Sequence, residues 1–238
     1  MASANPAAGS YALAIEGGEL VAVHAPKLPQ PGTKLTAPVR RLANGTFAEA
    51  GEVEKGKKTA TRVTFRGAVT FANLDPAALT YTVSGRGVSL PIQVAPEAVG
   101  AVPSLPPVGS YVTVTARIEE PAAGSSAAEP GTAAALVQSK VEVEPGPPST
   151  YLDLAGVVKE VSPDGHLIFS TDWTGHGDST LTLIVPAEID AAKLEPGDSY
   201  LATAEVGADG ALTLKGIAGD ERTKGADAPA GAQGDLAR

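Results

Sequence analysis

The chain lacks cysteine altogether and has little histidine, methionine or aromatic content. Its 238 residues include no Cys, three His, one Met and one Trp, and aromatic residues make up 4%. The absence of Cys excludes a disulfide scaffold, thiolate zinc sites, iron–sulfur clusters and cysteine nucleophiles. No apolar run approaches the roughly 18 residues of a transmembrane helix. We therefore predict no cofactor, no metal site and no membrane insertion.

Positive charge is also scarce. The chain has 18 Lys and Arg against 27 Asp and Glu, a formal net charge of −9 and a pI near 4.8. The charge is uneven, because residues 1–60 carry +2, residues 61–148 carry −2 and residues 149–238 carry −9. A protein that tracks a nucleic-acid backbone needs a positive surface, so the balance disfavours nucleic acid as a partner.

The motifs of common enzyme classes are missing too. The sequence contains no G-x-S-x-G, no H-E-x-x-H, no phosphate-binding loop and no dinucleotide fingerprint. Glu119-Glu120 and Glu142/Glu144 are carboxylate pairs by spacing, but solvated strand ends explain them more simply. We predict that the protein is not an enzyme.

Glycine and proline are plentiful instead, with 27 Gly and 20 Pro, and they separate short segments of alternating apolar residues. Segments of this length that alternate at period two and are rich in β-branched residues predict β-strands. Clear cases are Leu79/Tyr81/Val83, Val88/Leu90/Ile92, Val112/Val114/Ala116, Leu181/Leu183/Val185 and Leu212/Leu214. Only single helical turns are expected, at 96–101 and 186–193. The predicted fold class is all-β.

The strand pattern repeats along the chain. Arg66-Gly67-Ala68-Val69 returns as Ala155-Gly156-Val157-Val158, at an offset of 89 residues. Val94-Ala95-Pro96-Glu97 returns as Val185-Pro186-Ala187-Glu188, and Leu105-Pro106-Pro107-Val108-Gly109-Ser110-Tyr111 returns as Leu194-Glu195-Pro196-Gly197-Asp198-Ser199-Tyr200. The matched segments occur in the same order and are separated by nearly the same number of residues, which indicates two copies of one structural unit.

A third, shorter copy opens the chain. Lys27-Leu28-Pro29-Gln30-Pro31-Gly32 matches Lys193-Leu194-Glu195-Pro196-Gly197, and the glycine spacing that follows is the same in both. Asn44-Gly45 and Asp209-Gly210 are at matching places and predict type I′ hairpin turns. The first copy has only about 18 residues for the first half of the unit.

Each complete unit reads as five strands with a helical turn between the third and the fourth, which is the order of an OB-fold, a small Greek-key barrel. The chain thus resembles the tandem OB-fold-like domains of bacterial proteins of unknown function. A generic barrel or sandwich unit is the alternative. We expect a disordered N-terminus at 1–9, a partial β unit at 10–58, OB-like barrels at 59–146 and 150–219, and a disordered tail at 220–238. A long loop is expected at 119–135 and a stiff linker at 144–149.

The face formed by strands two and three binds ligands in OB-folds. In the last unit this place holds Phe169, Asp172, Trp173, His176 and Asp178. Trp173 could stack on a base or a sugar, and Asp172, His176 and Asp178, with His166 nearby, could bind a metal. The simpler interpretation is a polar hairpin loop whose tryptophan covers the end of the barrel.

The basic residues of the first unit gather in a cluster formed by Arg40, Arg41, Lys55, Lys57 and Lys58, at the opposite end of the sequence from the acidic unit. A molecule whose two ends carry opposite charge favours head-to-tail association. A barrel that lacks strands also exposes an edge with which another chain can pair. Ordinary surface solvation is the alternative interpretation of the cluster.

We therefore predict a non-enzymatic structural or interaction protein that self-assembles into homo-oligomers or filaments, with protein as its partner. The alternative is an OB-type module for single-stranded nucleic acid or oligosaccharide, centred on Trp173. A location outside the cytoplasm or at the cell surface is expected, with the cytoplasm as the alternative.

Overall fold

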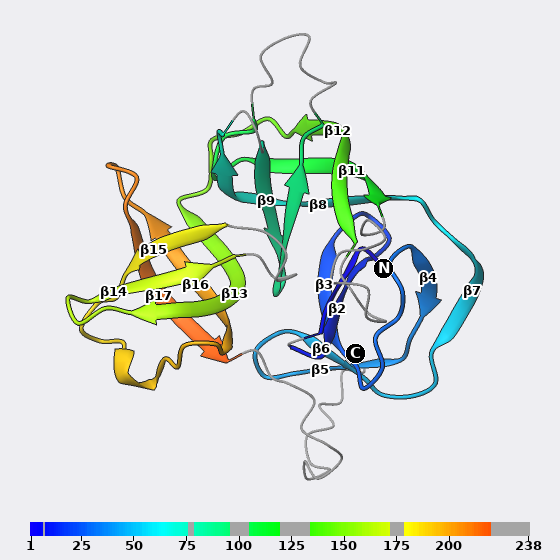
Figure 1. The fold of residues 1–238 in the computed structure, drawn as a ribbon, viewed down its shortest axis with the longest axis horizontal. Coiled ribbons are helices and arrows are strands. Elements are labelled where there is room, and N and C mark those ends of the chain that lie inside the picture. The colour runs from blue at the N-terminus through cyan, green and yellow to red at the C-terminus, as the bar shows by residue number, and fades with distance from the viewer. Residues whose placement is uncertain (7, 76–78, 96–104, 120–133, 172–178, 220–238) are drawn as a thin grey trace, which may run out of the picture.

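The computed structural model describes residues 1–6, 8–75, 79–95, 105–119, 134–171 and 179–219. Within these ranges the regular structure is strand, apart from one 3₁₀ turn (η2, Ala191–Lys193). No helix in the described part of the chain is long and apolar enough to cross a membrane. The predicted all-β fold is confirmed, and the strands form three units that occupy three lobes in Figure 1.

The third unit is a closed five-stranded barrel in the order β13-β14-β15-β17-β16. Its strands are β13 (Tyr151–Val161), β14 (His166–Ser170), β15 (Thr180–Ile184), β16 (Ser199–Val206) and β17 (Leu212–Gly219). β15 and β17 are parallel, and the other neighbouring pairs are antiparallel. In barrel order the strands run one-two-three-five-four, with η2 between three and four, so this unit has the OB arrangement.

The second unit repeats that topology as a closed barrel in the order β10-β12-β11-β8-β9. Its strands are β8 (Arg62–Asn73), β9 (Thr80–Gly85), β10 (Val88–Gln93), β11 (Tyr111–Glu119) and β12 (Ala135–Val143). Strands three and five, β10 and β12, are again parallel. The helical turn predicted at 96–101 and most of the loop predicted at 119–135 lie outside the described residues, as does the tail at 220–238.

The repeated glycine of strand one has a steric cause. A Cβ on Gly67 would lie 2.4 Å from the carbonyl oxygen of Ser84, and one on Gly156 would lie 1.9 Å from that of Ser170. Strand one passes this close to strand two where it bends to pair with strand four as well, so only glycine fits.

The first unit is an open version of the same barrel. Its main sheet has the order β1-β2-β3-β6-β5, and β4 pairs with β7 in a separate two-stranded ribbon. The strands are β1 (Ser3–Asn5), β2 (Ser10–Ala14), β3 (Leu20–His24), β4 (Thr33–Thr36), β5 (Val39–Arg41), β6 (Phe47–Glu49) and β7 (Glu54–Thr59). By their pairing, β4 and β5 are two pieces of strand four, and β6 and β7 are two pieces of strand five.

The N-terminus departs from the disorder expected at 1–9. β1 pairs with β2 through Ser3↔Ala12, Ala4↔Tyr11 and Asn5↔Ser10, and its residues are buried. Small residues permit this, because Ala2 and Ala4 fit between closely packed sheets without large side chains of their own.

The two hairpin turns predicted as type I′ are also different. Asn44 and Asp209 do not have positive φ, whereas Gly45 and Gly210 do, at 88° and 82°. The loops close with Leu42 N–H bonded to the Thr46 carbonyl and with the matching bond at 207–211, so each has three residues ending in a left-handed glycine.

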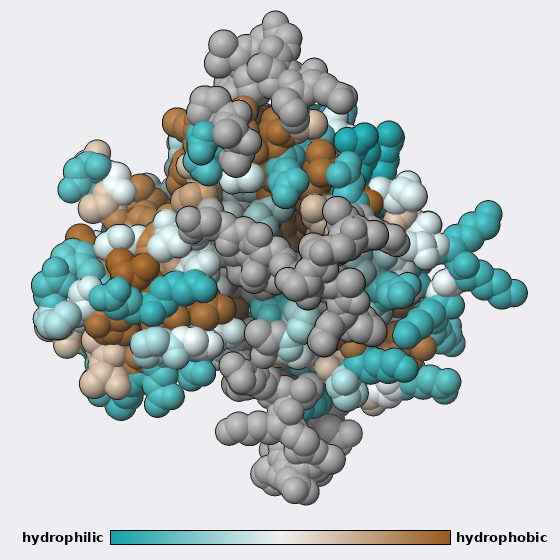
Figure 2. All heavy atoms as spheres, viewed as in Figure 1, coloured by the Kyte–Doolittle hydropathy of each residue, from teal (hydrophilic) through white to brown (hydrophobic). Residues whose placement is uncertain are grey.

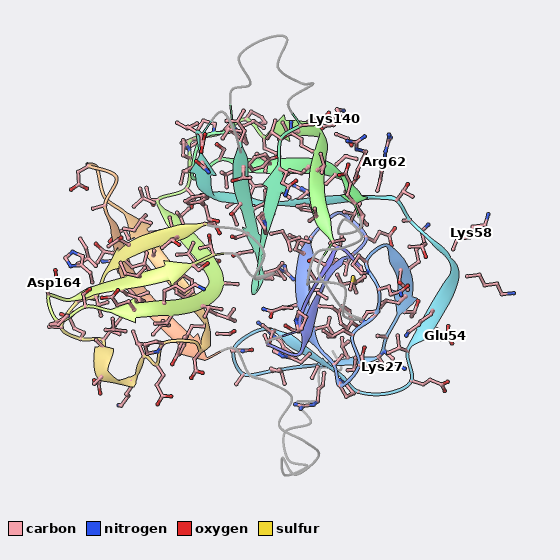
Figure 3. The ribbon with its side chains drawn as sticks, viewed as in Figure 1. Lys27, Glu54, Lys58, Arg62, Lys140 and Asp164 are labelled. Atoms are coloured by element: carbon pink, nitrogen blue, oxygen red, sulfur yellow. The ribbon has the colours of Figure 1, made fainter. Side chains whose placement is uncertain are left out.

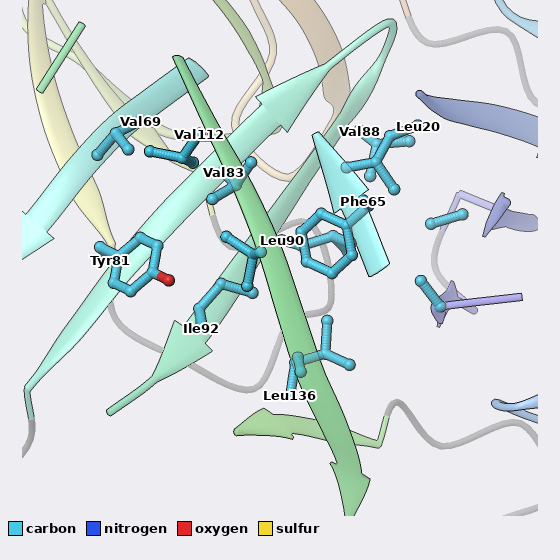
Figure 4. Packing of buried hydrophobic residues seen from close by; sticks show 14 of the residues in the cluster. Leu20, Phe65, Val69, Tyr81, Val83, Val88, Leu90, Ile92, Val112 and Leu136 are labelled. Atoms are coloured by element: carbon cyan, nitrogen blue, oxygen red, sulfur yellow. The ribbon is translucent and has the colours of Figure 1, made fainter. Parts of the chain in front are cut away.

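The first and second units each pack on a neighbouring unit through the face of strands two and three. Leu20, Ala12 and Ala22 on the outer face of β2 and β3 extend the core of the second barrel, where Leu20 lies beside Phe65 and Val88 (Figure 4). The opposite face of β2 and β3 fills the first unit's own smaller core.

The second and third units meet along β13, which packs against β8, β9 and β10. A chain of buried hydroxyls lies in this contact: Thr70 and Ser84 oxygens are 2.8 Å apart, and Ser84 and Ser89 oxygens are 2.7 Å apart. The Ala155 N–H then donates to the Ser89 hydroxyl at 2.9 Å. The predicted linker at 144–149 is held in place too, because Ser149 N–H donates to the Gly109 carbonyl.

Candidate functional site

The predicted ligand residues around Trp173 are only partly placed. Phe169 is fully buried in the core of the third barrel, so it contributes to packing and offers no surface to a ligand. Asp172, Trp173, His176 and Asp178 lie outside the described residues. His166 is described, and its Nδ1 lies 3.1 Å from Asp164, whose carboxyl pKa is lowered by hydrogen bonding to His166. No group of three His, Asp or Glu within the described ranges could hold a metal ion.

The face that OB-folds use for ligands is largely occupied within this molecule. In the first unit it packs on the second barrel, and in the second unit it packs on β13. Thr182 and Ile184 on β15 remain exposed in the third unit. The described residues of that face in β14 and β15 include no Lys or Arg, and the partly exposed ring of His166 lies on it.

A cleft of about 830 Å³ lies where the three units meet, and it is here named the central cleft. It is lined by Arg41, Asn44 and Phe47 of the first unit, Arg86 and Gly87 of the second, and Asp153, Leu201 and Thr203 of the third, among others. The first and third units are also tied at this point, because Asn44 Nδ2 donates to the Gly219 carbonyl at 3.1 Å.

The turn between β9 and β10 sets the position of Arg86 in the cleft. Gly85 pairs with Val88, so the loop has two residues, and both Arg86 (φ 40°) and Gly87 (φ 82°) have the positive φ of a type I′ turn. Arg86 is the described part's one non-glycine residue with positive φ, a conformation that costs about 1 kcal/mol or more. Its guanidinium pairs with Glu19 at 3.2 Å on the surface.

A second hollow of about 420 Å³ adjoins the first, since both share Arg86 and Asp153. It runs between the second and third barrels and is here named the tyrosine groove, because Tyr111 and Tyr151 line it. Tyr111 is 42% exposed and Tyr151 is 54% exposed. Each is the first residue of its strand, β11 and β13, which leaves both rings at the rim of a barrel.

The Tyr111 ring is in contact with a positively charged side chain. The Arg66 guanidinium lies 5.6 Å from the ring centroid, within the range of a cation–π contact. Arg66 is itself fixed by Glu144, whose Oε1 accepts from Nε at 3.1 Å and from a terminal nitrogen at 2.7 Å. The Arg66–Glu144 pair therefore restricts the Tyr111 ring where it lines the groove.

The charges of the two hollows nearly balance. Arg41, Arg86, Asp153 and Glu144 are the charged residues that line them, and of these Arg86 is paired with Glu19 and Glu144 with Arg66. Asp153 accepts a hydrogen bond from the Thr203 hydroxyl at 2.9 Å. In the described part of the chain no carboxylate lies within 4.0 Å of the Arg41 guanidinium.

The predicted basic cluster is divided by the fold. All five residues are exposed, but Arg41 on β5 lines the central cleft, whereas Arg40 on β5 and Lys55, Lys57 and Lys58 on β7 do not line it. Sequence reasoning overlooked Tyr111 and Tyr151, because each opens a strand and looks like an ordinary strand residue. The signal available was that both directly follow Pro- and Gly-rich segments, which end at the rims of the barrels.

Comparisons with known proteins add little here. No family model matches the chain, and no curated protein matches it. A search of solved structures returns a wild-type single-stranded DNA binding protein from Thermus aquaticus at 14% identity and TM-score 0.27, covering 71% of this chain and 96% of that one. A deletion mutant of the same protein matches at 13% identity and TM-score 0.28, covering 71% and 97%. Likeness at these TM-scores decides nothing about function, and the OB assignment rests on strand order and pairing.

Proposed function

We propose that this chain is a non-enzymatic binding protein that holds an oligosaccharide in the tyrosine groove and the adjoining central cleft. The observation that carries the proposal is the pair of half-exposed rings, Tyr111 and Tyr151, lining one groove beside Arg86 and Asp153. A sugar ring has an apolar face of C–H groups that packs on an aromatic ring, and hydroxyls around its edge that need donors and acceptors. The groove offers both.

The charge of the site favours a sugar over a nucleic acid. Single-stranded nucleic acid is bound by a positively charged groove that follows the phosphates and by successive aromatic platforms. Here Arg86 is paired with Glu19 and Glu144 with Arg66, which leaves Arg41 and Asp153 as one charge of each sign, and the whole chain carries −9. Planar side chains of both signs are suited instead to the hydroxyl groups of a neutral or weakly charged sugar.

A binding role also fits the carboxylates better than hydrolysis does. A glycosidase needs one carboxyl group kept protonated in apolar surroundings as its general acid. Glu144 and Asp153 are both solvent-accessible, and they already accept hydrogen bonds from Arg66 and Thr203. Neither is desolvated as an acid catalyst has to be.

Isothermal titration calorimetry of the full chain tests the proposal. The probes are neutral and uronic-acid oligosaccharides of three to six sugar units, together with a twelve-residue oligothymidylate. We expect at least one oligosaccharide to bind and the oligothymidylate not to bind. Failure of every sugar, or tighter binding of the oligothymidylate, contradicts the proposal.

Variants then assign the binding to the groove. Tyr111→Ala and Tyr151→Ala should each weaken sugar binding by about tenfold, the cost of one lost stacking platform of about 1–2 kcal/mol. Tyr111→Phe keeps the ring and should bind within about twofold of the wild type. Tyr200→Ala is the matched control, because Tyr200 does not line either hollow. Equal affinities for all four variants would contradict this placement of the site.

A further inference from the structure

We propose that the ligand of the two hollows is an acidic oligosaccharide, whose neutral units lie on Tyr111 and Tyr151 and whose carboxylate is bound by Arg41 in the central cleft. This inference rests on the proposed function and adds to it the class of sugar and the end of the site that takes the charged unit. It begins from the different charges of the tyrosine groove and the central cleft.

Among the described residues, the tyrosine groove has no unpaired cation. Of the charged residues that line it, Arg86 is paired with Glu19 at 3.2 Å and Glu144 is paired with Arg66 at 2.7 Å. Asp153 is the one charged lining residue that forms no ion pair with another described residue. A carboxylate on the ligand would meet a like charge there, whereas sugar hydroxyls can donate to Asp153. This part of the site therefore suits neutral sugar units.

The central cleft has the cation that the groove lacks. Arg41 lines this cleft and not the tyrosine groove, and no carboxylate in the described ranges lies within 4.0 Å of its guanidinium. A guanidinium group presents a planar fork of N–H donors that matches the two oxygens of a carboxylate, and charge strengthens both hydrogen bonds. The acidic unit of the ligand therefore fits at Arg41.

Strands β5 and β6 place Arg41 beside an aromatic ring. Arg41 is opposite Phe47 in the register of the two strands, so both side chains project from the same face of the sheet, and both residues line the cleft. Phe47 is partly exposed. A sugar unit can pack a face of C–H groups on such a ring while its carboxylate reaches the neighbouring guanidinium. The pair thus offers the two contacts that a uronic acid needs.

The cleft has room for a sugar. Its volume of about 830 Å³ lies within the range of small-molecule sites, about 300–1,000 Å³. The third unit lines it with Ala202, Gly216 and Ala218, and a Cβ on Gly216 would meet nothing within 4 Å. The loop after β5 lies beside the end of β17 (Figure 1), where the Asn44–Gly219 hydrogen bond joins the first and third units. The two sides of the cleft are therefore held together before a ligand enters.

The other basic residues of the predicted cluster lie away from both hollows. Arg40, Lys55, Lys57 and Lys58 line neither of them. Figure 3 shows Lys58 pointing away from the ribbon, and Figure 2 shows hydrophilic side chains extending on the side where β7 lies. The site thus has one unpaired cation among its described lining residues, on a chain of net charge −9. A ligand with few charges fits this balance better than one with a charge on every unit.

Isothermal titration calorimetry of the full chain with matched pairs of sugars tests the inference. Each pair consists of a neutral tetrasaccharide of glucose, galactose or mannose and the same chain with one terminal unit oxidised to the uronic acid. We expect the acidic member to bind about fivefold tighter at low salt, and the difference to shrink as salt rises, because the contact is partly exposed to solvent.

The outcomes separate this inference from the proposed function. Equal affinities within every pair that binds, or tighter binding of the neutral member, would overturn the acidic ligand and leave sugar binding in place. No binding by any of these sugars contradicts the proposed function itself, and the inference fails with it.

Two neighbouring residues on β5 assign the preference to the cleft. Arg41→Met removes the guanidinium and keeps an apolar side chain, so the acidic and neutral members of each pair should bind within about twofold of one another. Arg40→Met is the matched control, because it loses the same charge from an exposed neighbour that lines neither hollow, and it should keep the preference of the wild type. A preference that survives in Arg41→Met, or an equal loss in both variants, would overturn the inference.

Discussion

Gly87 is the residue at which all three units touch, and replacing it with alanine tests how tightly they are joined. An added Cβ would lie 2.7 Å from Cγ2 of Thr46 in the first unit and 3.5 Å from Leu201 in the third. Thr46 cannot rotate away at no cost. It is fully buried, and its hydroxyl donates to Asn44 Oδ1 at 2.7 Å and lies 3.2 Å from His24 Nε2.

The expected cost has two parts. Alanine at a φ of 82° loses about 1–2 kcal/mol, and forcing a methyl group into a packed contact costs about 1–3 kcal/mol more. The sum of about 2–5 kcal/mol should lower the melting temperature of a chain of this size by on the order of 10 °C. Urea unfolding followed by far-ultraviolet circular dichroism measures the free energy directly.

Gly210→Ala separates the two parts. Gly210 has the same φ of 82°, and a Cβ there meets nothing within 4 Å, so this variant should lose only about 1–2 kcal/mol. In Gly87→Ala/Thr46→Ser the clashing methyl group is gone, and the excess cost over Gly210→Ala should largely disappear. Equal losses in the two single alanine variants, or no recovery in the double variant, would refute the three-unit contact.

Three further changes test other features. Ser89→Ala leaves the buried Ala155 N–H without its acceptor and should cost about 1–3 kcal/mol in urea unfolding; an unchanged midpoint would contradict the role of the hydroxyl chain. Gly156→Ala should prevent closure of the third barrel, at about 3 kcal/mol or more, and limited proteolysis would detect it; full resistance argues against the steric cause. Hydrogen bonding by Lys215 lowers the pKa of the Glu205 carboxyl. The pair therefore adds to the free energy of unfolding at neutral pH, and this contribution is lost as the pH falls through that pKa. In Lys215→Ala the Glu205 carboxyl should titrate at higher pH by NMR, and an unshifted titration would contradict the pairing.

The barrels could be predicted from the sequence because their signals are local and repeated. Alternating apolar residues define each strand, and Gly67 and Gly156 recur at the bend that only glycine tolerates. With the glycines that begin strand four, these signals predict the order of five strands twice over. The topology then follows from the few ways in which such a chain can close.

The packing between units could not be predicted in the same way. Ala12 and Ala22 pack on the second barrel, and Ser84 and Ser89 lie under the third, yet small and hydroxyl side chains on alternate positions look like solvent-facing residues. For the same reason the sequence does not reveal that β1 is an ordered, buried strand, because its residues are small and polar. The candidate site depends on this packing, because the tyrosine groove exists only where two barrels meet.

The buried hydroxyl chain also bears on the synthesis of the protein. The second unit is complete before the third has left the ribosome, so the face that β13 will cover is exposed for a time. Thr70, Ser84 and Ser89 lie on that face, and their hydroxyls can bond to water until Ala155 arrives to replace it. A leucine-rich interface would expose apolar surface during that interval and favour aggregation. The hydroxyls of this interface remain hydrated, which disfavours aggregation with other nascent chains until the third unit is made.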